Sequence, residues 1–174
     1  MNYLRDRRPN LDLEGIDIDP GKVSVATTCK DNRVRISLGN AAGLPAESYD
    51  CITIPDVLYL LPGDGKYRLL SDCFDALKPG GLLLLKEVDT KPRWKYAVAK
   101  AEEVLAVKIA RFTQGNAVDF LPSGDCTELL GNIGFEGAEV MRLDRGYPHP
   151  YVLVSGKRPH KTVSKIVYSA VDAA

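Results

Sequence analysis

Apolar runs alternate with amphipathic stretches along most of this chain, and one such change is especially clear. Residues 67–77 place apolar side chains at helical spacing, and an apolar run opens the segment from Leu82 to Val88. Such a run is typical of a strand that is buried on both faces of a sheet. Between the two, Pro79 cannot continue a helix, while Gly80 and Gly81 permit the positive φ of a tight turn. The pattern therefore predicts a helix-to-strand junction inside an α/β sheet.

The remaining elements follow from the same patterns. Asp19 suits the N-cap of a helix, and Pro20 suits its first turn. Strands are expected over residues 11–17, 34–38, 49–54, 82–88, 137–143 and 151–155, and helices over residues 1–8, 20–29, 67–77, 92–109 and 123–132, with a helix or turn at residues 57–61. Strands that alternate with helices predict a mostly parallel sheet covered on both faces, and the short link between the last two strands suggests an antiparallel C-terminal edge strand.

The composition fits one globular domain. The chain has 174 residues, of which 45% are hydrophobic and 26% are charged, and it is long enough to bury a core. We expect that domain to span residues 1–157, followed by a weakly patterned and mobile tail at residues 158–174. The formal net charge is +0 and the pI is about 6.7. That balance gives no general attraction to nucleic acid or to anionic membranes, so neither is expected as a partner.

The cysteines and the N-terminal residues bear on metal binding and on location. None of the 4 cysteines forms a C-x-x-C pair, so no zinc site is expected. Cys51 and Cys73 lie in apolar or helical contexts and are expected to be core or partly buried thiols, as in a reducing cytoplasm. Residues 1–10 are polar and basic, without the apolar core of a signal peptide. No apolar run is long enough to cross a bilayer, so we expect a cytoplasmic protein that does not insert in membranes.

Polar side chains follow three of the predicted strands, at the edge of a parallel sheet where ligands bind. Asp17 ends the first strand, and a carboxylate there can accept hydrogen bonds from both hydroxyls of a ribose. Asn40 follows Gly39 after the next strand and offers both an acceptor and a donor to an adenine edge. Asp56 follows Pro55 after the third predicted strand, residues 49–54. Each has a plainer alternative, because Asp17 and Asp56 suit helix caps and Asn40 suits an ordinary turn.

Taken in order, these segments resemble a class I S-adenosylmethionine-dependent methyltransferase from its second strand to its seventh, over residues 10–157. The most specific parts of the resemblance are the stretch from Gly39 to Asp50 and the junction from Lys78 to Gly81. The resemblance implies a Rossmann-like fold, S-adenosylmethionine as the cofactor, and transfer of a methyl group to a small molecule. It also implies the residues that bind the cofactor, which are Asp17 at the ribose with Ile18 beside it, Asn40 and Ala41 at the adenine, and Pro55 and Asp56 beside the methionine portion.

The chain departs from this family at two places. It has Asn40 where the family usually has Asp, which weakens an adenine contact without excluding it. No glycine-rich cofactor loop precedes Leu11, and residues 1–9 resemble the end of the helix that should follow that loop. The family's first strand lies in the middle of the sheet, and its loss would leave two rows of backbone groups unpaired. We therefore expect one of three arrangements: a missing N-terminus, direct pairing of the two flanking strands, or a second chain, such as another copy, that completes the sheet.

The distal half supplies candidates for the acceptor site. Aromatic side chains there and after the third strand could line a substrate pocket, and each also suits a plain core: Tyr59, Trp94, Phe112, Phe120 and Tyr147. His149 lies between two prolines and is a candidate general base, with a rigid turn as the alternative. Asp56 is the second candidate for a catalytic role. Methyl transfer needs alignment of the nucleophile with the sulfonium more than it needs a dedicated base, so no catalytic residue is assigned.

Three functions stay open on the sequence alone. The first is an S-adenosylmethionine-dependent methyltransferase for a small-molecule acceptor, whose oxygen, nitrogen or carbon nucleophile the sequence does not distinguish. The second is a non-catalytic methyltransferase-like subunit that acts through a partner chain. The third is a nicotinamide-dependent enzyme, since Asp17 suits either ribose, but the junction from Lys78 to Gly81 argues against it.

Overall fold

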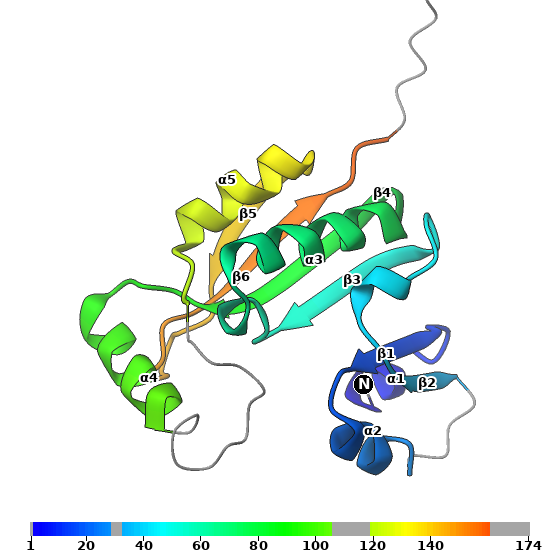
Figure 1. Ribbon diagram of the computed structural model, residues 1–174, viewed down its shortest axis with the longest axis horizontal. Helices are drawn as coiled ribbons and strands as arrows, with labels where there is room; N and C mark the ends of the chain where they lie inside the picture. Colours follow the sequence, from blue (N-terminus) through cyan, green and yellow to red (C-terminus); the bar gives the residue numbers. More distant parts are fainter. Residues whose placement is uncertain (1, 29–32, 106–118, 161–174) are drawn as a thin grey trace, which may run out of the picture.

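The chain folds into two separate β-sheets (Figure 1). The computed structural model describes residues 2–28, 33–105 and 119–160. β1 (Leu13–Asp17) and β2 (Val34–Leu38) pair in parallel as a two-stranded sheet. The other sheet has four strands in the order β3 (Tyr49–Pro55), β4 (Leu77–Val88), β6 (Tyr151–Lys157) and β5 (Glu136–Arg142). Within the described residues no strand pairing joins β1 to β3, so direct pairing of these strands, one of the three expected arrangements, is excluded.

The two-stranded sheet has little burial of its own. It carries α1 (Asn2–Arg7) and α2 (Pro20–Ala26). Asp19 caps α2 as predicted, because its Oδ1 accepts from the backbone N–H of Gly21 at 2.8 Å. Val34 is buried, whereas α2 contributes no buried residue at all. This part of the chain therefore has correct local structure but almost no core.

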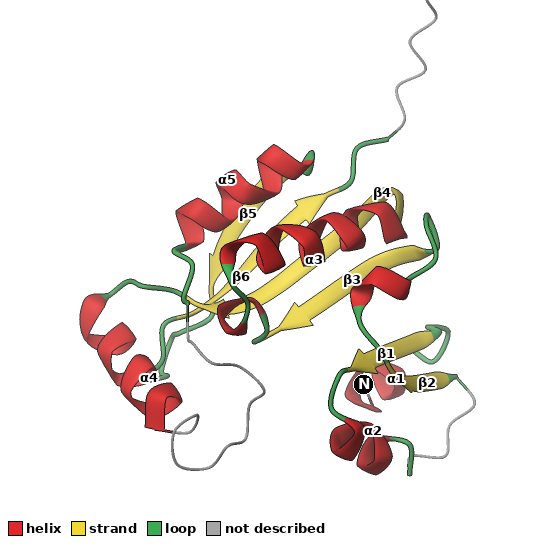
Figure 2. Cartoon of the chain, viewed as in Figure 1, coloured by secondary structure: helices red, strands yellow, loops and turns green. Residues whose placement is uncertain are grey.

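Helices cover one face of the four-stranded sheet (Figure 2). α3 (Gly63–Ala76) and α5 (Ser123–Ile133) lie side by side on that face. Their apolar side chains join Leu83 and Leu85 of β4, both 0% exposed, in a single cluster of buried residues. Burial of large apolar side chains is the main favourable term in folding, so this cluster is the stable centre of the molecule.

The other face of this sheet and its β3 edge are more exposed. Leu82 and Leu84 alternate with the core residues of β4 and are only half-buried. Cys51 on β3 is exposed, because β3 is an edge strand and α3 and α5 lie over the opposite face, so the expectation of a buried thiol is wrong there. Cys73 on α3 is buried as expected. The apolar pattern therefore predicted more burial than the sheet provides.

The change from helix to strand is present as predicted, but it comes earlier, so that Pro79, Gly80 and Gly81 lie inside β4 and not before it. β4 begins at Leu77, directly after the helix. Gly80 has a φ of 81°, and its N–H donates to the Arg158 carbonyl at 2.8 Å. The Gly81 carbonyl accepts from the Arg158 N–H at 2.9 Å. The turn is therefore an irregular stretch at the start of β4, held by the first residues after β6.

Some boundaries differ from the predicted ones. α3 begins at Gly63 rather than at residue 67, because Pro62 takes the N-cap position and the following glycines continue the helix. β6 is antiparallel to both of its neighbours, as predicted for one of the last strands, but it lies between them, so β5 forms the edge. Most of the predicted tail, residues 161–174, lies outside the described residues. None of the helices in the described part of the chain is both long and apolar enough to cross a membrane.

Candidate functional site

The carboxyl ends of β1 and β3 point to the same side of the molecule, as their arrowheads in Figure 1 show. Asp17 ends β1 and is half-buried, and its Oδ1 accepts from the Asp19 N–H at 2.9 Å. The Asp17 carbonyl accepts from the Gly39 N–H at 3.1 Å, so the loop after β2 lies directly beside it. Ile18, the next residue, is largely exposed. The structure thus brings Asp17 and the Gly39 loop together at one end of the two-stranded sheet.

The side chain of Asn40 caps a short 3-10 helix, η1 (Ala41–Gly43). Its Oδ1 accepts from the Ala42 N–H at 3.2 Å, and Ala41 is buried in the core cluster. A Cβ added at Gly39 would meet no heavy atom within 4 Å, so the space beside that residue is open. The capping turn is therefore present, and contact of Asn40 with adenine stays a prediction.

Asp56 follows Pro55 and turns the chain sharply after β3. Its φ is 56°, in the left-handed region that residues other than glycine adopt only at a cost. The Asp56 carboxylate forms an ion pair with Lys86 Nζ, and the Asp56 N–H donates to the Lys86 carbonyl at 2.8 Å. Val57 takes the N-cap position of the following turn, η2 (Leu58–Leu60), without a side-chain hydrogen bond, so the alternative of Asp56 as a cap is wrong. Its carboxylate instead faces Lys86 at the carboxyl end of β4.

Glu87 lies beside this pair and was not predicted. It is 7% exposed, and its Oε1 accepts from the backbone N–H of Leu58 at 3.1 Å and of Val57 at 3.4 Å. Burial raises the pKa of the Glu87 carboxyl to about 7, with the nearby Asp56 charge adding to the rise and the two backbone N–H groups opposing it. A carboxylate inside an apolar strand was the available signal, because buried charges need specific partners.

Aromatic rings gather next to this turn. Tyr59 is buried and stacks on Phe120 with ring centroids 5.1 Å apart. Tyr96 of α4 (Arg93–Leu105) meets the same Phe120 ring edge-on at 5.4 Å. The Asp119 N–H donates to the Tyr59 carbonyl at 2.8 Å, which fixes the segment that carries Phe120. Two of the predicted pocket aromatics therefore meet, and Tyr96 joins them without having been predicted.

The other aromatic candidates do not join this group. Trp94 is 63% exposed and Tyr147 is 60% exposed, so the expectation that they line one pocket with Tyr59 is not supported by their burial. Phe112 lies outside the described residues. Trp94 does not suit a plain core either, and among the side chains of α4 whose burial the structure describes, Ala99 is the buried one.

The Tyr151 ring lies between His149 and the Asp56–Lys86 ion pair. It stacks on Tyr151 with ring centroids 5.4 Å apart, and Lys86 Nζ lies 4.1 Å from the centre of the Tyr151 ring. The Tyr151 N–H donates to the His149 carbonyl at 3.0 Å, which fits the rigid turn that was its alternative. Asp56, Lys86, Tyr151 and His149 thus form a continuous row across the ends of β3, β4 and β6.

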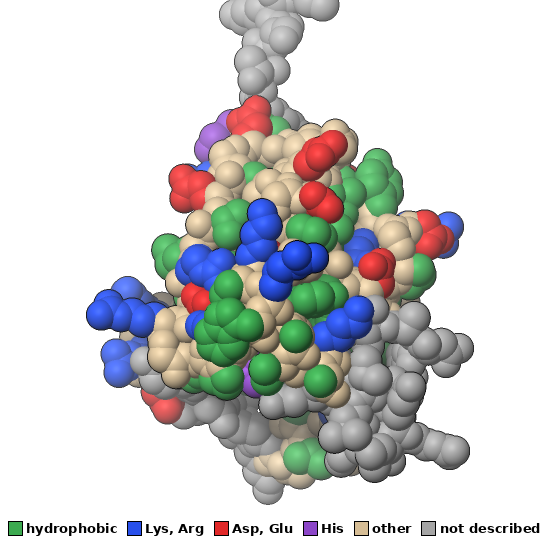
Figure 3. All heavy atoms as spheres, turned by 90° about the vertical axis from the view of Figure 1, so that its left-hand side faces the viewer, with side chains coloured by type: hydrophobic (Ala, Val, Ile, Leu, Met, Phe, Trp, Pro, Cys, Tyr) green, Lys and Arg blue, Asp and Glu red, His purple; other side chains and the backbone are tan. Residues whose placement is uncertain are grey.

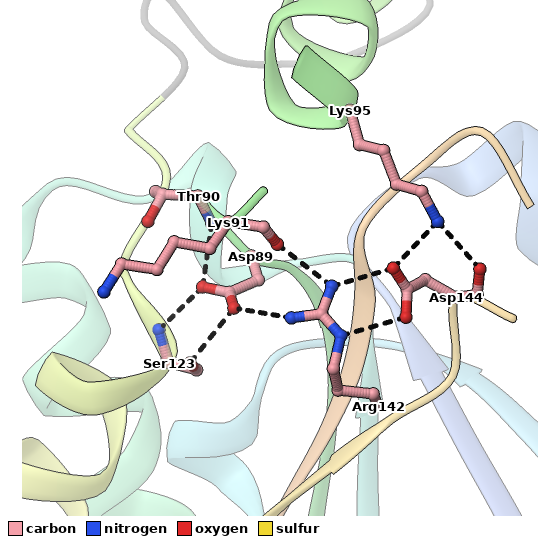
Figure 4. A network of polar contacts seen from close by, with 7 residues as sticks. All are labelled: Asp89, Thr90, Lys91, Lys95, Ser123, Arg142 and Asp144. Carbon is pink, nitrogen blue, oxygen red and sulfur yellow. Dashed lines mark hydrogen bonds and ion pairs between the residues drawn. The ribbon is translucent and has the colours of Figure 1, made fainter. Parts of the chain in front are cut away.

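A polar network ties the end of β4 to α4, α5 and β5 (Figure 4). The buried Asp89 accepts from Ser123 N–H at 3.1 Å and from Ser123 Oγ at 3.2 Å, so it caps α5 from a distance. Arg142 Nη1 lies 3.6 Å from Asp89 Oδ2. The same guanidinium donates two hydrogen bonds to Asp144, from Nε to Oδ1 at 3.0 Å and from Nη2 to Oδ2 at 2.8 Å. Arg142 and Lys95 hold the pKa of Asp144 well below its usual range. This network positions the helices around the site.

An open cavity of about 580 Å³ lies beside this network, lined by Thr90, Lys91, Arg93 and Tyr96. The face seen in Figure 3 carries several Lys and Arg side chains among hydrophobic ones. Among the described residues, no group of three or more His, Cys, Asp or Glu side chains is placed to hold a metal ion.

The comparisons with known proteins match part of the chain in sequence and most of it in fold. A family model described as a methyltransferase domain matches residues 1–85, just under half of the chain. An uncharacterized protein from Haemophilus influenzae is 29% identical over 83 residues, which cover 44% of this chain and 33% of that protein. The chain therefore spans about one third of the length of the curated relative that it matches.

Solved structures share the fold over most of the chain. The S-adenosylmethionine-dependent methyltransferase SibL, in its apo form, has a TM-score of 0.70 at 22% identity, over 91% of this chain and 46% of that one. A complex from Haloferax volcanii pairs the Trm112 methyltransferase activator with a chain described as a methyltransferase; the TM-score is 0.71 at 16% identity, over 91% and 77% of the two chains. The sequence match over residues 1–85 is thus to a methyltransferase domain, and the chain shares its fold with solved S-adenosylmethionine-dependent methyltransferases.

Proposed function

We propose that this chain binds the nucleoside part of S-adenosylmethionine at the carboxyl ends of β1, β2 and β3 and transfers the methyl group to a small-molecule acceptor. The observation that carries the proposal is the position of Asp17 beside the open space at Gly39, on the side of the molecule to which β3 also presents Asp56. Ligands of open α/β sheets bind at this edge.

The residues present fit the adenosine part of this cofactor. A half-buried carboxylate at the end of β1 suits the two ribose hydroxyls, and charge-assisted hydrogen bonds are the stronger kind. The open space at Gly39 lets a flat ring approach the backbone closely, with Asn40 at its edge. The bound cofactor would supply an electrophilic methyl group on its sulfonium.

The methionine part has fewer partners in this chain. The first glycine of the sequence is Gly15, so the described residues before β1 offer no glycine-rich loop. Asp56 and Lys86 present a carboxylate and an ammonium group at the end of β3 and β4, which suits the amino and carboxylate groups of a methionine. The chain itself therefore orients the nucleoside and supplies charge near the amino acid portion.

A second candidate function is a methyltransferase-like subunit that acts through a partner chain. The observation that favours it is the pair of strands, β1 and β3, each with one edge that pairs with no described strand. The Haloferax volcanii complex contains a methyltransferase activator, so a relative in fold does assemble with another chain. In this alternative a strand from the partner would complete the sheet and the cofactor site together.

Isothermal titration of the full chain with S-adenosylhomocysteine distinguishes the two. Micromolar binding, weakened in Asp17→Ala and kept in the matched Asp12→Ala variant of the exposed residue before β1, supports the cofactor site. No binding by the wild-type chain contradicts a self-sufficient site and favours the partner-dependent subunit. A methylation assay then needs candidate acceptors, which the cavity beside Tyr96 helps to choose.

A further inference from the structure

Glu87 is an unusual residue for its position. It stands near the end of β4, between Lys86 and Val88, with its side chain 7% exposed and no basic side chain hydrogen-bonded to it among the described contacts. Its carboxylate instead accepts from two consecutive backbone N–H groups, those of Val57 and Leu58. A buried carboxyl that is retained without a salt bridge has a specific structural task or is a large cost to the fold.

We propose that Glu87 is a positioning residue for the cofactor edge, whose carboxylate holds the backbone at Val57 and Leu58 and thereby sets the Asp56 turn. The proposal rests on the proposed function only in its last step, the effect on cofactor binding. The link between Glu87 and the turn is a statement about the fold and is tested separately.

The geometry explains why the turn needs such a hold. Asp56 adopts a left-handed φ of 56°, which costs energy that the surroundings must offset. No side chain of the turn itself caps η2, so the two N–H groups at its start depend on Glu87. Leu58, which donates the shorter of the two bonds, is 1% exposed and seats the turn in the core. Glu87 therefore connects the rigid end of β4 to a strained turn that carries a charged side chain.

The groups that face Glu87 set when its carboxyl carries a charge. Asp56, after β3, repels the carboxylate, and Lys86, its neighbour on β4, attracts it. Cys126 faces it from α5, and burial raises the pKa of that thiol to about 12, so the thiol stays neutral near pH 7. Burial raises the pKa of Glu87 to about 7. The two hydrogen bonds to the turn are therefore strongest above neutral pH, because a charged acceptor forms stronger hydrogen bonds than a neutral one, while ionising the buried carboxyl lowers the stability of the fold as a whole.

Amide exchange in the full-length chain tests the first step without any ligand. The measurement is the protection of the Leu58 and Val57 amides, relative to their intrinsic exchange rates, from pH 5.5 to 8.5. In the wild type we expect protection to fall at least about fivefold as the pH rises through 7, because an opening that exposes Glu87 lets its carboxyl ionise in water. In Glu87→Gln the profile should be flat, and in the control Glu139→Gln, an exposed glutamate of β5, it should match the wild type.

Two outcomes overturn the proposal. One is a flat Leu58 profile in the wild type, and the other is a profile that Glu87→Gln leaves unchanged while the Leu85 amide in the core stays protected. If Glu87→Gln does not fold, the wild-type chemical shift of the Leu58 amide proton, followed over the same pH range, decides in its place. A titration midpoint near 7 supports the proposal, and its absence contradicts it.

Cofactor binding tests the second step. Affinity for S-adenosylhomocysteine should increase about fivefold from pH 6 to pH 8 in the wild type and should stay at the weaker value in Glu87→Gln. Binding that is equally tight at both pH values overturns the proposed role at the site. No binding at any pH, together with a titrating Leu58 amide, contradicts the proposed function instead and leaves the role of Glu87 in the turn standing.

Discussion

The two sheets of this chain differ in burial far more than in local structure. The four-stranded sheet, with α3 and α5, holds a continuous core that includes Leu83, Leu85 and Leu130, all 0% exposed. The two-stranded sheet has well-formed strands and a capped helix, yet of the residues described in β1, β2 and α2 Val34 is the buried one, and Leu38 is 59% exposed. A sheet of two strands is marginal in water without a face to pack on. The lesson is that correct local structure does not ensure an independent core.

This difference divides the candidate site. Asp17 and Asn40 lie on the weakly buried part, whereas Asp56, Lys86 and Glu87 lie on the well-buried part. A hydrogen bond from Tyr49 Oη to Glu14 Oε2, at 3.0 Å, links the start of β3 to β1. We infer that a ligand or strand bound between the two parts would order the first part more than the second, because stability is lowest there.

The largest contrast is expected from core truncation. Leu85→Ala should lower the free energy of unfolding by about 2–5 kcal/mol, because it removes a fully buried side chain and leaves a cavity. Leu38→Ala, at the exposed end of β2, should change it by less than about 0.5 kcal/mol. Urea unfolding followed by circular dichroism measures both. Similar losses in the two variants would show that the two-stranded sheet shares the core after all.

The next effect is a pH dependence of the free energy of unfolding, which we expect from Glu87 in the four-stranded sheet. Since the pKa of Glu87 rises from 4.5 to about 7 on folding, the folded state binds the extra proton between these values. The free energy of unfolding should therefore fall as the pH rises from about 4.5 to about 7, by up to about 3 kcal/mol. Glu87→Gln should remove this slope, and a slope that survives in the variant would assign it to another group.

A smaller effect is expected at the weakly buried end of the site. Asp17→Ala should weaken binding of S-adenosylhomocysteine by about 1–3 kcal/mol, the scale for charged hydrogen bonds. Titration calorimetry measures the loss, and Asp12→Ala serves as the control for a carboxylate outside the site. Unchanged affinity in Asp17→Ala would show that Asp17 does not bind the ligand. The residues at the end of β3 would then be the remaining candidates for the site.

The smallest effect concerns the link between the parts. Tyr49→Phe removes the hydroxyl that donates to Glu14 and should cost less than about 1 kcal/mol, because the pair is exposed. Its effect should be confined to faster amide exchange in β1 and β2. Equal acceleration in β4 would mean that the two sheets open together, contrary to the comparison.

Local signals in the sequence predicted most elements correctly. Asp19 and Pro20 start α2, and Pro79 with Gly80 marks the irregular first part of β4, because each acts through its own backbone geometry. The separation into two sheets was beyond such signals, since strand pairing depends on segments that are distant in sequence. The apolar run of β4 overestimated burial for the same reason: periodicity does not reveal whether a second layer is present.

The site divides in the same way. Asp17, Asn40 and Asp56 were predicted because each follows a strand, and the structure places them at strand ends on one side. The contact of Glu87 with Leu58 joins residues 29 positions apart, and its energetic meaning comes from burial that no local pattern shows. Likewise the Tyr59–Phe120 stack depends on how α4 and the segment before α5 return to η2.

The central claim is that one cofactor molecule bridges the two unequal parts of the chain. Adding S-adenosylhomocysteine to the isotope-labelled full-length chain and recording amide chemical shifts tests it directly. The account predicts that the amides at residues 17–19, 39–42 and 56–58 shift together, with one common dissociation constant. Shifts confined to one of the two sheets, or no shifts at all at millimolar ligand, would contradict it.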